Sequence, residues 1–160
     1  MKWTLRHSLR HGDIGYVTYL HGTVYAREYG YDIAFEAYVA SGLAEFIQSF
    51  NPQRDCIWLA EVKHHIVGSV AIVGRSRLKA QVRWFFVHPE YRGQNIGKSL
   101  LKEAVRFCKQ RKYKTVFLWT TSELEAARHV YMDIGFRKTD EKKHRIWGTA
   151  VKEERYVLRL

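Results

Sequence analysis

The sequence predicts an α/β (α+β) fold with one mixed central sheet of about seven strands and four helices. Three observations lead to this prediction: the chain has 160 residues, 46% of them are hydrophobic, and apolar periods of 3.6 and 2 alternate along it. The length fits one domain over residues 1–160, and the apolar content suffices for a buried core. The expected order of elements is β-α-α-β-β-β-α-β-α-β-β, which favours helices packed against one sheet.

The first part of the chain is expected to hold one strand and two helices. Residues 1–7 alternate loosely and are interpreted as a short strand. Asp13 is placed to cap a helix that runs to about Tyr29, and Asp32 is placed to cap the next helix. Asn51-Pro52 is expected to end this second helix, because the residue before a proline is disfavoured in the helical region.

The middle of the chain changes to strand periodicity. Residues 56–62 and 66–73 form two apolar runs, and residues 63–65 between them are few enough for a hairpin turn. Residues 82–87 form a third run. This run ends at His88-Pro89, because proline cannot continue a strand ladder.

Helix and strand alternate after the third run. Apolar residues at helical spacing predict an amphipathic helix over residues 96–112. A strand over 115–119 and a helix over 123–134 follow. Gly135 stands where a glycine cap at a helix C-terminus belongs.

The last two strands are expected over roughly residues 136–143 and 152–160.

The chain is strongly basic. It has 27 Lys and Arg against 16 Asp and Glu, a formal net charge of +11. Such an excess suits a phosphate-bearing ligand, a nucleic acid or an anionic membrane. The basic residues are scattered, however, and the densest run, residues 137–145, is interrupted by two acids. We interpret this run as a solvated surface hairpin.

Several classes of protein do not fit the sequence. The longest nearly uninterrupted apolar stretch, residues 66–74, has nine residues, whereas a membrane-spanning helix needs about 20. No apolar segment follows residues 1–7, so we expect neither a membrane span nor a secretory signal. Cys56 and Cys108 lie in no CxxC pattern and are interpreted as reduced thiols of a cytoplasmic protein. The histidines do not combine with carboxylates at metal-ligand spacing, so we expect no metal.

Residues 86–101 carry the most informative pattern. A strand ends, a loop containing Gly93 and Asn95 follows, and a long helix begins near Ile96. The N–H groups of a first helical turn have no intrahelical acceptor, and they coincide with the positive end of the helix dipole. Gly93 and Gly97 let the main chain approach an anion closely. The pattern predicts a phosphate cradle, although it matches neither GxxxxGK[ST] nor GxGxxG.

This stretch resembles the pyrophosphate loop of the GNAT superfamily of acyl-CoA-dependent N-acyltransferases. In that family, a strand ending in V-x-P precedes the motif Q/R-x-x-G-x-G/A. Here Val87-His88-Pro89 precedes Arg92, which takes the Q/R position, and Gly97 takes the last position. Asn95 stands where the first motif glycine is usual, and Asn is the residue after glycine that best tolerates a left-handed conformation.

A second block strengthens the resemblance. Ala127 and Tyr131 match the family's A-x-x-x-Y pattern, and Gly135-Phe136 matches the G-F that follows it. Many members have an asparagine seven residues before the tyrosine, where this chain has Leu124. The resemblance covers essentially the whole chain. A looser likeness connects it to the acetyltransferase domain found fused to winged-helix regulators in some bacteria, on the residues Leu118-Trp119-Thr120, Ala126-Ala127-Arg128 and Trp147-Gly148.

The resemblance implies acetyl-CoA as cosubstrate and an amine as acetyl acceptor. It implies Tyr131 as general acid, because its ordinary pKa of about 10 keeps it protonated. The usual strand carboxylate is absent, so Glu28, Asp32 and Glu36 are candidates for the general base, with a water chain as the alternative. Tyr25, Tyr29 and Trp84 are expected to bind the acceptor. The expected cofactor-binding residues are Phe86, Val87, Arg92, Gly93, Gln94, Asn95, Ile96, Gly97, Lys98, Ser99, Ala127 and Tyr131.

Two other hypotheses about the function remain open from the sequence alone. One is a GNAT fold that binds CoA without catalysis. The other is a basic nucleic-acid-binding module, which the absence of any recognised nucleic-acid-binding motif disfavours. The acceptor is expected to be a small-molecule or protein amine, and the oligomeric state is left open between a monomer and a homodimer.

Overall fold

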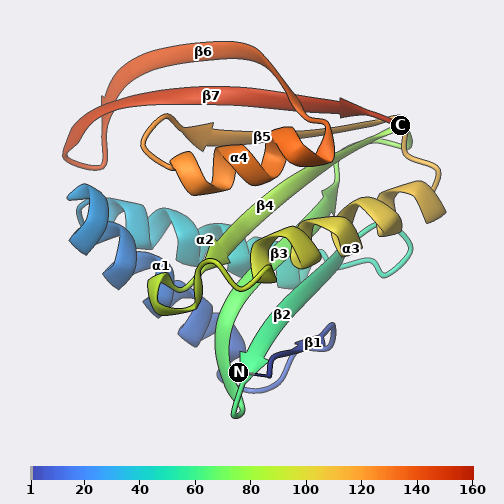
Figure 1. The fold of residues 1–160 in the computed structure, drawn as a ribbon, viewed down its shortest axis with the longest axis horizontal. Helices are drawn as coiled ribbons and strands as arrows, with labels where there is room; N and C mark the ends of the chain where they lie inside the picture. Colours follow the sequence, from blue (N-terminus) through green and yellow to red (C-terminus); the bar gives the residue numbers. More distant parts are fainter. Residues whose placement is uncertain (1) are drawn as a thin grey trace.

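The computed structural model describes residues 2–160 and arranges them as seven strands and four α-helices around one sheet (Figure 1). The strands are β1 (Thr4–Arg6), β2 (Cys56–Val62), β3 (His65–Gly74), β4 (Lys79–Val87), β5 (Thr115–Thr121), β6 (Arg137–Ile146) and β7 (Thr149–Arg159). The helices are α1 (Asp13–Tyr29), α2 (Ile33–Gln48), α3 (Ile96–Gln110) and α4 (Glu125–Ile134), with a short 3₁₀ turn at Pro89–Tyr91. The predicted fold class and order of elements are confirmed.

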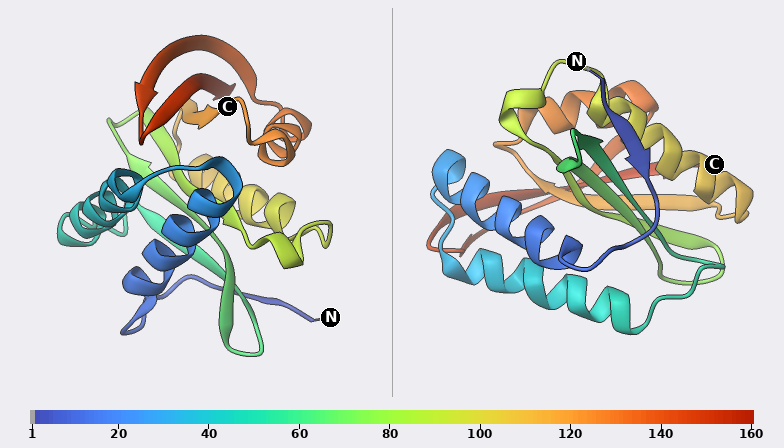
Figure 2. Two further views of the ribbon diagram at one scale, coloured as in Figure 1. Left: turned by 90° about the vertical axis from the view of Figure 1, so that its left-hand side faces the viewer. Right: turned by 90° about the horizontal axis from the view of Figure 1, so that it is seen from below.

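The sheet is mixed, in the order β1-β2-β3-β4-β5-β7-β6. Neighbouring strands are antiparallel except β4 and β5, which are parallel and connected through α3. The long β6–β7 hairpin arches away from the rest of the sheet (Figures 1 and 2). No helix within residues 2–160 is both long and apolar enough to cross a membrane.

Two helical layers cover the two faces of the sheet (Figure 2). Helices α1 and α2 bury one apolar cluster, in which Leu43 and Leu59 are fully buried. Helices α3 and α4 bury the other, in which Leu100, Leu101 and Phe136 are fully buried. The apolar face of α3 follows from its sequence spacing, because residues three and four apart lie on one side of a helix.

Strands β4 and β5 separate soon after they begin. Their pairing extends only over Lys79–Gln81 on β4. On its other side β4 carries an irregularity opposite Ser69–Ala71, where Trp84 has a left-handed φ of 50°. An extra residue of this kind bends a strand and increases its local twist. The bend opens a split between β4 and β5.

Most differences from the sequence expectations lie at helix ends. Asp13 is the first residue of α1 and not its cap; its carboxylate instead binds Arg6 at 2.6 Å and the N–H of Arg10 at 2.7 Å. Arg6 also pairs with Glu61 at 3.1 Å, so the carboxylate serves a buried ion network. Asp32 caps α2 as predicted, accepting from the N–H of Ala34 at 3.0 Å.

The remaining boundaries shift by a few residues. Helix α3 ends two residues before the predicted end, and α4 begins two residues after the predicted start. The turn between β2 and β3 consists of Lys63 and His64, both with positive φ, and the turn between β6 and β7 consists of Trp147 and Gly148, also both positive. Two-residue turns with this geometry match the twist of antiparallel strands, so β6 and β7 extend further than predicted.

Candidate active site

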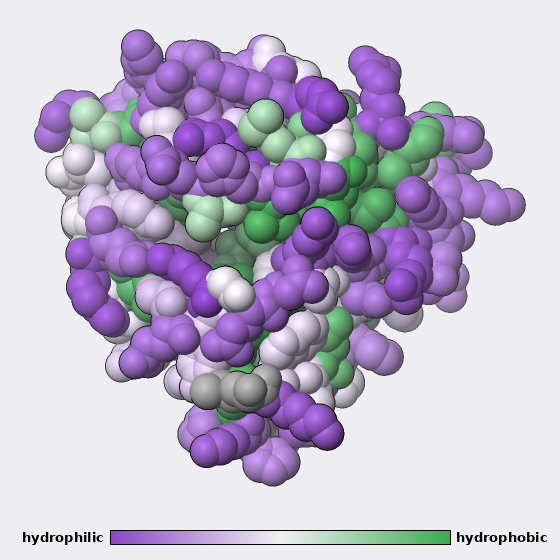
Figure 3. All heavy atoms as spheres, in the orientation of Figure 1, coloured by the Kyte–Doolittle hydropathy of each residue, from purple (hydrophilic) through white to green (hydrophobic). Residues whose placement is uncertain are grey.

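A cavity of about 790 Å³ lies at the split between the strands, beside the start of α3 and of α4. The space-filling view shows this face hollowed between α4 and the loop that leads into α3 (Figure 3). Of the residues predicted to bind a cofactor, those that line the cavity are Phe86, Val87, Arg92, Gly93, Asn95, Ile96, Gly97, Lys98 and Ala127. Gln94 and Ser99 are not among its lining residues, and Tyr131 lines a neighbouring cavity instead.

The loop at this cavity leaves the first amides of α3 free to bind an anion. Gly93 and Asn95 both adopt left-handed conformations, with φ of 79° and 67°. The Asn95 side chain caps nothing, and the first N–H that binds back into the helix is that of Ser99, at 3.1 Å from the Asn95 carbonyl. The preceding amides, including those of Gly97 and Lys98, therefore have no intrahelical acceptor. With the helix dipole they form a site suited to a phosphate or pyrophosphate.

Gly97 also fixes how closely α3 approaches β4. A Cβ at this position would lie 3.1 Å from Cζ of Phe85 and 3.3 Å from Cγ2 of Val87. A side chain at this position would press on Phe85 and Val87, so glycine lets the first turn of α3 sit against the strand without displacing them. The glycine therefore sets the distance between the free amides and the strand at the split.

Arg92 lies at the cavity in a two-bond ion pair with Glu28 of α1. Its Nη1 lies 3.0 Å from Oε2 and its Nη2 lies 2.8 Å from Oε1. This hydrogen bonding to Glu28 raises the pKa of Arg92. Glu28 lines neither cavity.

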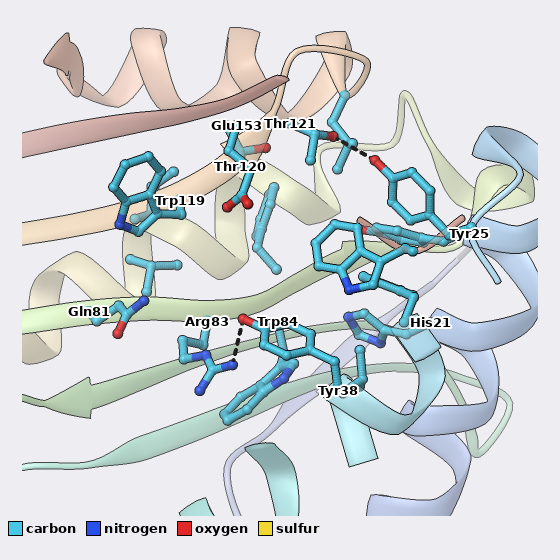
Figure 4. A pocket seen from close by; sticks show the side chains of 18 of the residues that line it. His21, Tyr25, Tyr38, Gln81, Arg83, Trp84, Trp119, Thr120, Thr121 and Glu153 are labelled. Carbon is cyan, nitrogen blue, oxygen red and sulfur yellow. Dashed lines mark hydrogen bonds between the residues drawn. The ribbon is translucent and has the colours of Figure 1, made fainter. Parts of the chain in front are cut away.

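A second, smaller cavity of about 130 Å³ lies on the other side of the split, between β4 on one side and β5 and β7 on the other (Figure 4). It shares Tyr25, Phe85 and Leu124 with the larger cavity, so the two meet there. Aromatic rings make up much of its wall, namely Tyr25, Tyr31, Phe35, Tyr38, Trp84, Phe85, Trp119, Tyr131 and Trp147.

Tyr131 of α4 lines this smaller cavity in a buried position. Burial raises its pKa above the ordinary value of 10; the Thr120 side chain acts in the opposite direction, and neighbouring Tyr156 in the same direction as burial. The phenol therefore keeps its proton across the physiological pH range. Tyr25 shows the same effect, since burial and then Tyr131 raise its pKa.

His21 of α1 is a buried wall residue that the sequence analysis did not select. Its Nδ1 lies 2.8 Å from the carbonyl of Val17, and because a carbonyl can only accept, Nδ1 carries the proton. Its Nε2 is buried without a hydrogen-bond partner among residues 2–160. Burial lowers the pKa of His21 to about 4, so the ring is neutral at pH 7 with a free lone pair on Nε2. Its helical position among Val17, Val24 and Tyr25 was the one signal that could have indicated it.

Two other buried polar atoms of this wall lack partners within the described chain: Nε1 of Trp84 and Oγ1 of Thr120. Buried polar atoms in folded proteins are nearly always hydrogen-bonded. Together with Nε2 of His21, they give the smaller cavity unused donors and acceptors.

The remaining predicted site residues are distributed as follows. Tyr29 lines the larger cavity, whereas Tyr25 lines both and Trp84 the smaller one. Glu36 lines neither; its side chain packs against Gly22 at the contact between α1 and α2. These placements do not favour Glu28 or Glu36 as the base that serves an acceptor.

Cys56 and Cys108 are both free, and burial raises the pKa of each. Within residues 2–160, no three His, Cys, Asp or Glu side chains are grouped to hold a metal ion.

A family model described as the acetyltransferase (GNAT) family matches residues 19–136. Among curated proteins, the chain is similar to N-acetyltransferase 8B of Homo sapiens, with 29% identity over 101 residues that cover 60% of this chain and 44% of that protein. The chain spans about half the length of the curated relatives it matches.

Solved structures share the fold over nearly the whole chain. A GNAT family acetyltransferase from Staphylococcus aureus superposes with a TM-score of 0.81 at 19% identity, covering 99% of both chains. A GNAT family acetyltransferase from Elizabethkingia anophelis, solved with acetyl-CoA bound, superposes with a TM-score of 0.69 at 16% identity, covering 99% of this chain and 98% of that one.

Proposed function

Because the chain belongs to the acetyltransferase (GNAT) family, we propose that it transfers an acetyl group from acetyl-CoA to an amine held in the smaller cavity. The observation that carries this proposal is the meeting of the two cavities at Tyr25, Phe85 and Leu124. One cavity ends at an anion-binding helix start, and the other is lined mostly by aromatic side chains. A thioester and an amine entering from opposite sides would meet at the split.

The residues of the larger cavity fit acetyl-CoA. The free amides at the start of α3 and the ammonium of Lys98 supply positive charge for a pyrophosphate. The apolar side chains of Val87, Ala127 and Val130 line the cavity as well and suit the uncharged part of the molecule. Leu124 takes the position of the family's asparagine, so the side-chain hydrogen bond made there in many members is absent.

The main chain of β4 can polarise the thioester carbonyl. The N–H of His88 donates to the Val67 carbonyl of β3 at 2.7 Å. Consecutive N–H groups of a strand point to opposite sides, so the N–H of Val87 faces the split. A donor fixed at this position stabilises the negative charge that develops on the carbonyl oxygen.

The reaction requires two proton transfers, for which His21 is placed as the acceptor and Tyr131 as the donor. The amine nitrogen bonds to the carbonyl carbon and the carbon–sulfur bond breaks. His21 Nε2 accepts the proton that the amine loses, and Tyr131 donates one to the departing thiolate. His21 then releases its proton to solvent, and Tyr131 takes up a proton from solvent, so that both side chains return to their starting protonation states. The low pKa of His21 makes it a weak base, but it keeps the lone pair available at neutral pH.

The proposal is tested by two measurements on the same protein. Calorimetry with CoA and acetyl-CoA reports binding, and release of free thiol in the presence of an amine panel, with mass spectrometry of the products, reports transfer. Binding with amine-dependent thiol release and an acetylated product is the expected result. Binding without transfer to any amine would instead indicate a CoA-binding fold without catalysis, and binding of DNA but not CoA at moderate salt would favour the nucleic-acid reading.

A further inference from the structure

The smaller cavity contains a cation that no carboxylate within residues 2–160 neutralises. Arg83 of β4 lines it, and its guanidinium lies 4.4 Å from the ring centre of Trp84 and 5.5 Å from that of Tyr38. Nη2 donates to the Tyr38 hydroxyl at 3.1 Å, a bond drawn in Figure 4. None of the salt bridges formed within residues 2–160 includes Arg83. The two rings hold the guanidinium in place but leave its charge unmatched.

The other charges around the cavity do not cancel this one. Glu153 of β7 lies on the opposite wall (Figure 4), and its carboxylate is already 2.6 Å from Nε2 of His144. Arg75 lies close enough that Arg83, after burial, lowers its pKa, while Glu45 and Asp55 act on Arg75 in the opposite direction. Arg83 itself has no carboxylate partner among residues 2–160, so the wall around its guanidinium is positive. A simple cationic amine would be repelled there, unless it brought an anion of its own.

The aromatic walls of the smaller cavity favour a ligand with a flat, apolar ring. The Trp147 ring lies 4.9 Å from Phe35, 5.1 Å from Tyr31 and 5.7 Å from Tyr38, measured between ring centres. Aromatic rings at these distances pack by edge and offset contacts, and a ring in the ligand would extend the same packing. The unpartnered atoms of His21, Trp84 and Thr120 add both acceptors and donors for polar groups on such a ligand.

We propose that the acetyl acceptor is an aromatic amine that also carries a carboxylate, of which aromatic amino acids are the simplest members. The amine lies at the split, the ring lies among the aromatic walls, and the carboxylate pairs with Arg83. The planar fork of an arginine suits a carboxylate with two parallel hydrogen bonds. Arg83 precedes Val87, whose N–H faces the thioester carbonyl, by four residues, which at ~3.3 Å per residue keeps the two ends within roughly 13 Å. This inference rests on the proposed acetyl transfer.

The test compares amines that differ in one group at a time. L-phenylalanine and 4-(2-aminoethyl)benzoate carry ring, amine and carboxylate in two arrangements; 2-phenylethylamine lacks the carboxylate, and L-alanine lacks the ring. We expect kcat/KM for the better of the first two to exceed both others at least tenfold. The Arg83→Gln variant should lose at least tenfold for that substrate through KM, and Arg83→Lys should keep part of the activity. For 2-phenylethylamine, Arg83→Gln should not lower kcat/KM and should raise it, because the charge that repels a simple cationic amine is gone. Arg77→Gln, an exposed arginine outside the cavity, is the matched control.

Each outcome decides the inference. A preference for 2-phenylethylamine or L-alanine, or an equal loss for all amines in Arg83→Gln, would overturn it while leaving acetyl transfer standing. If acetyl-CoA binds but no amine is acetylated, the proposed function fails. The acceptor class is then decided by calorimetry of N-acetyl-L-phenylalanine and 4-(2-acetamidoethyl)benzoate in the presence of CoA. Binding of either that weakens at least tenfold in Arg83→Gln supports the class, and its absence, or equal binding by both proteins, rejects it.

Discussion

Glu28 and Arg92 are joined by two hydrogen bonds, of 2.8 and 3.0 Å, that connect helix α1 to the loop in front of α3. On sequence alone, Glu28 is a candidate base and Arg92 a candidate cofactor ligand, and no local pattern pairs them. Both side chains are about one-third exposed, so the pair contributes at most about 1 kcal/mol to stability. Its importance is electrostatic, because Glu28 opposes the positive charge that Arg92 brings to the larger cavity.

We expect Glu28→Gln to tighten CoA binding two- to threefold. The Coulomb energy between a unit charge and a phosphate charge roughly 8 Å apart in water is about 0.5 kcal/mol. Glu28→Gln removes a repulsion of this size. The gain should shrink at high salt. Turnover at saturating acetyl-CoA should not change. Calorimetry at two salt concentrations measures the effect, with Glu45→Gln on the exposed face of α2 as control. A large fall in turnover with unchanged CoA affinity would restore Glu28 as the base.

We expect Tyr131→Phe to lower turnover by about 10²- to 10⁴-fold with little change in CoA affinity, because one proton donor is lost. Since burial raises the pKa of Tyr131, its ionisation should not limit activity of the parent protein up to about pH 10. Steady-state kinetics across pH measures both. Tyr113→Phe, whose hydroxyl binds the Arg54 carbonyl, is a distant control. Turnover near that of the parent protein would mean that another group protonates the thiolate.

We expect His21→Leu to lower kcat about 10- to 100-fold while the Kd for CoA stays the same. Leucine keeps the apolar packing against Phe86 and Tyr25, whose rings lie 5.0 and 5.6 Å from the imidazole, but it removes the free Nε2. Kinetics at saturating acetyl-CoA, with a calorimetric Kd, separate the two effects. Unchanged kcat would leave a water chain as the route for the amine's proton.

We also expect His21 to make the protein less stable as the pH falls from about 6.5 to 4. In the unfolded chain the imidazole takes up a proton near its ordinary pKa of 6.5, whereas in the folded protein burial delays this to about 4. The unfolded state therefore binds more protons in this window, and the loss amounts to about 3 kcal/mol between pH 7 and pH 4.

Denaturant unfolding at several pH values measures this loss. The difference in unfolding free energy between pH 7 and pH 4 should be about 3 kcal/mol smaller in His21→Leu. His129→Gln, an exposed histidine of α4, should behave like the parent protein. Parallel pH curves for the parent and His21→Leu would show that the imidazole is not held neutral by burial.

We expect Gly97→Ala to lower CoA affinity at least tenfold and to destabilise the fold by about 1–3 kcal/mol, because its Cβ would force α3 away from Phe85 and Val87. Gly15→Ala in α1 is the matched control. A Cβ there meets nothing within 4 Å, so it should stabilise the protein by up to about 1 kcal/mol. Calorimetry and denaturant unfolding measure both variants. Unchanged affinity in a folded Gly97→Ala protein would remove the start of α3 from the cofactor site.

The sequence by itself determined the elements of the fold and their order. The amphipathic spacing of α3 and the apolar runs of β2 to β4 are local patterns, because side-chain direction repeats with the period of each element. The loop from Gly93 to Gly97 could also be predicted, because glycine and asparagine permit left-handed backbone and the start of a helix offers free amides to an anion.

The tertiary structure alone decided which side chains share a cavity. His21, Arg83 and Trp147 come from α1, β4 and the β6–β7 turn, and no local pattern connects residues so distant in sequence. The same holds for Glu28, which a helical pattern presents as a free carboxylate until the fold brings Arg92 to within 2.8 Å of it. Burial and pairing set the charge state of such groups, and both depend on neighbours that only the folded chain assembles.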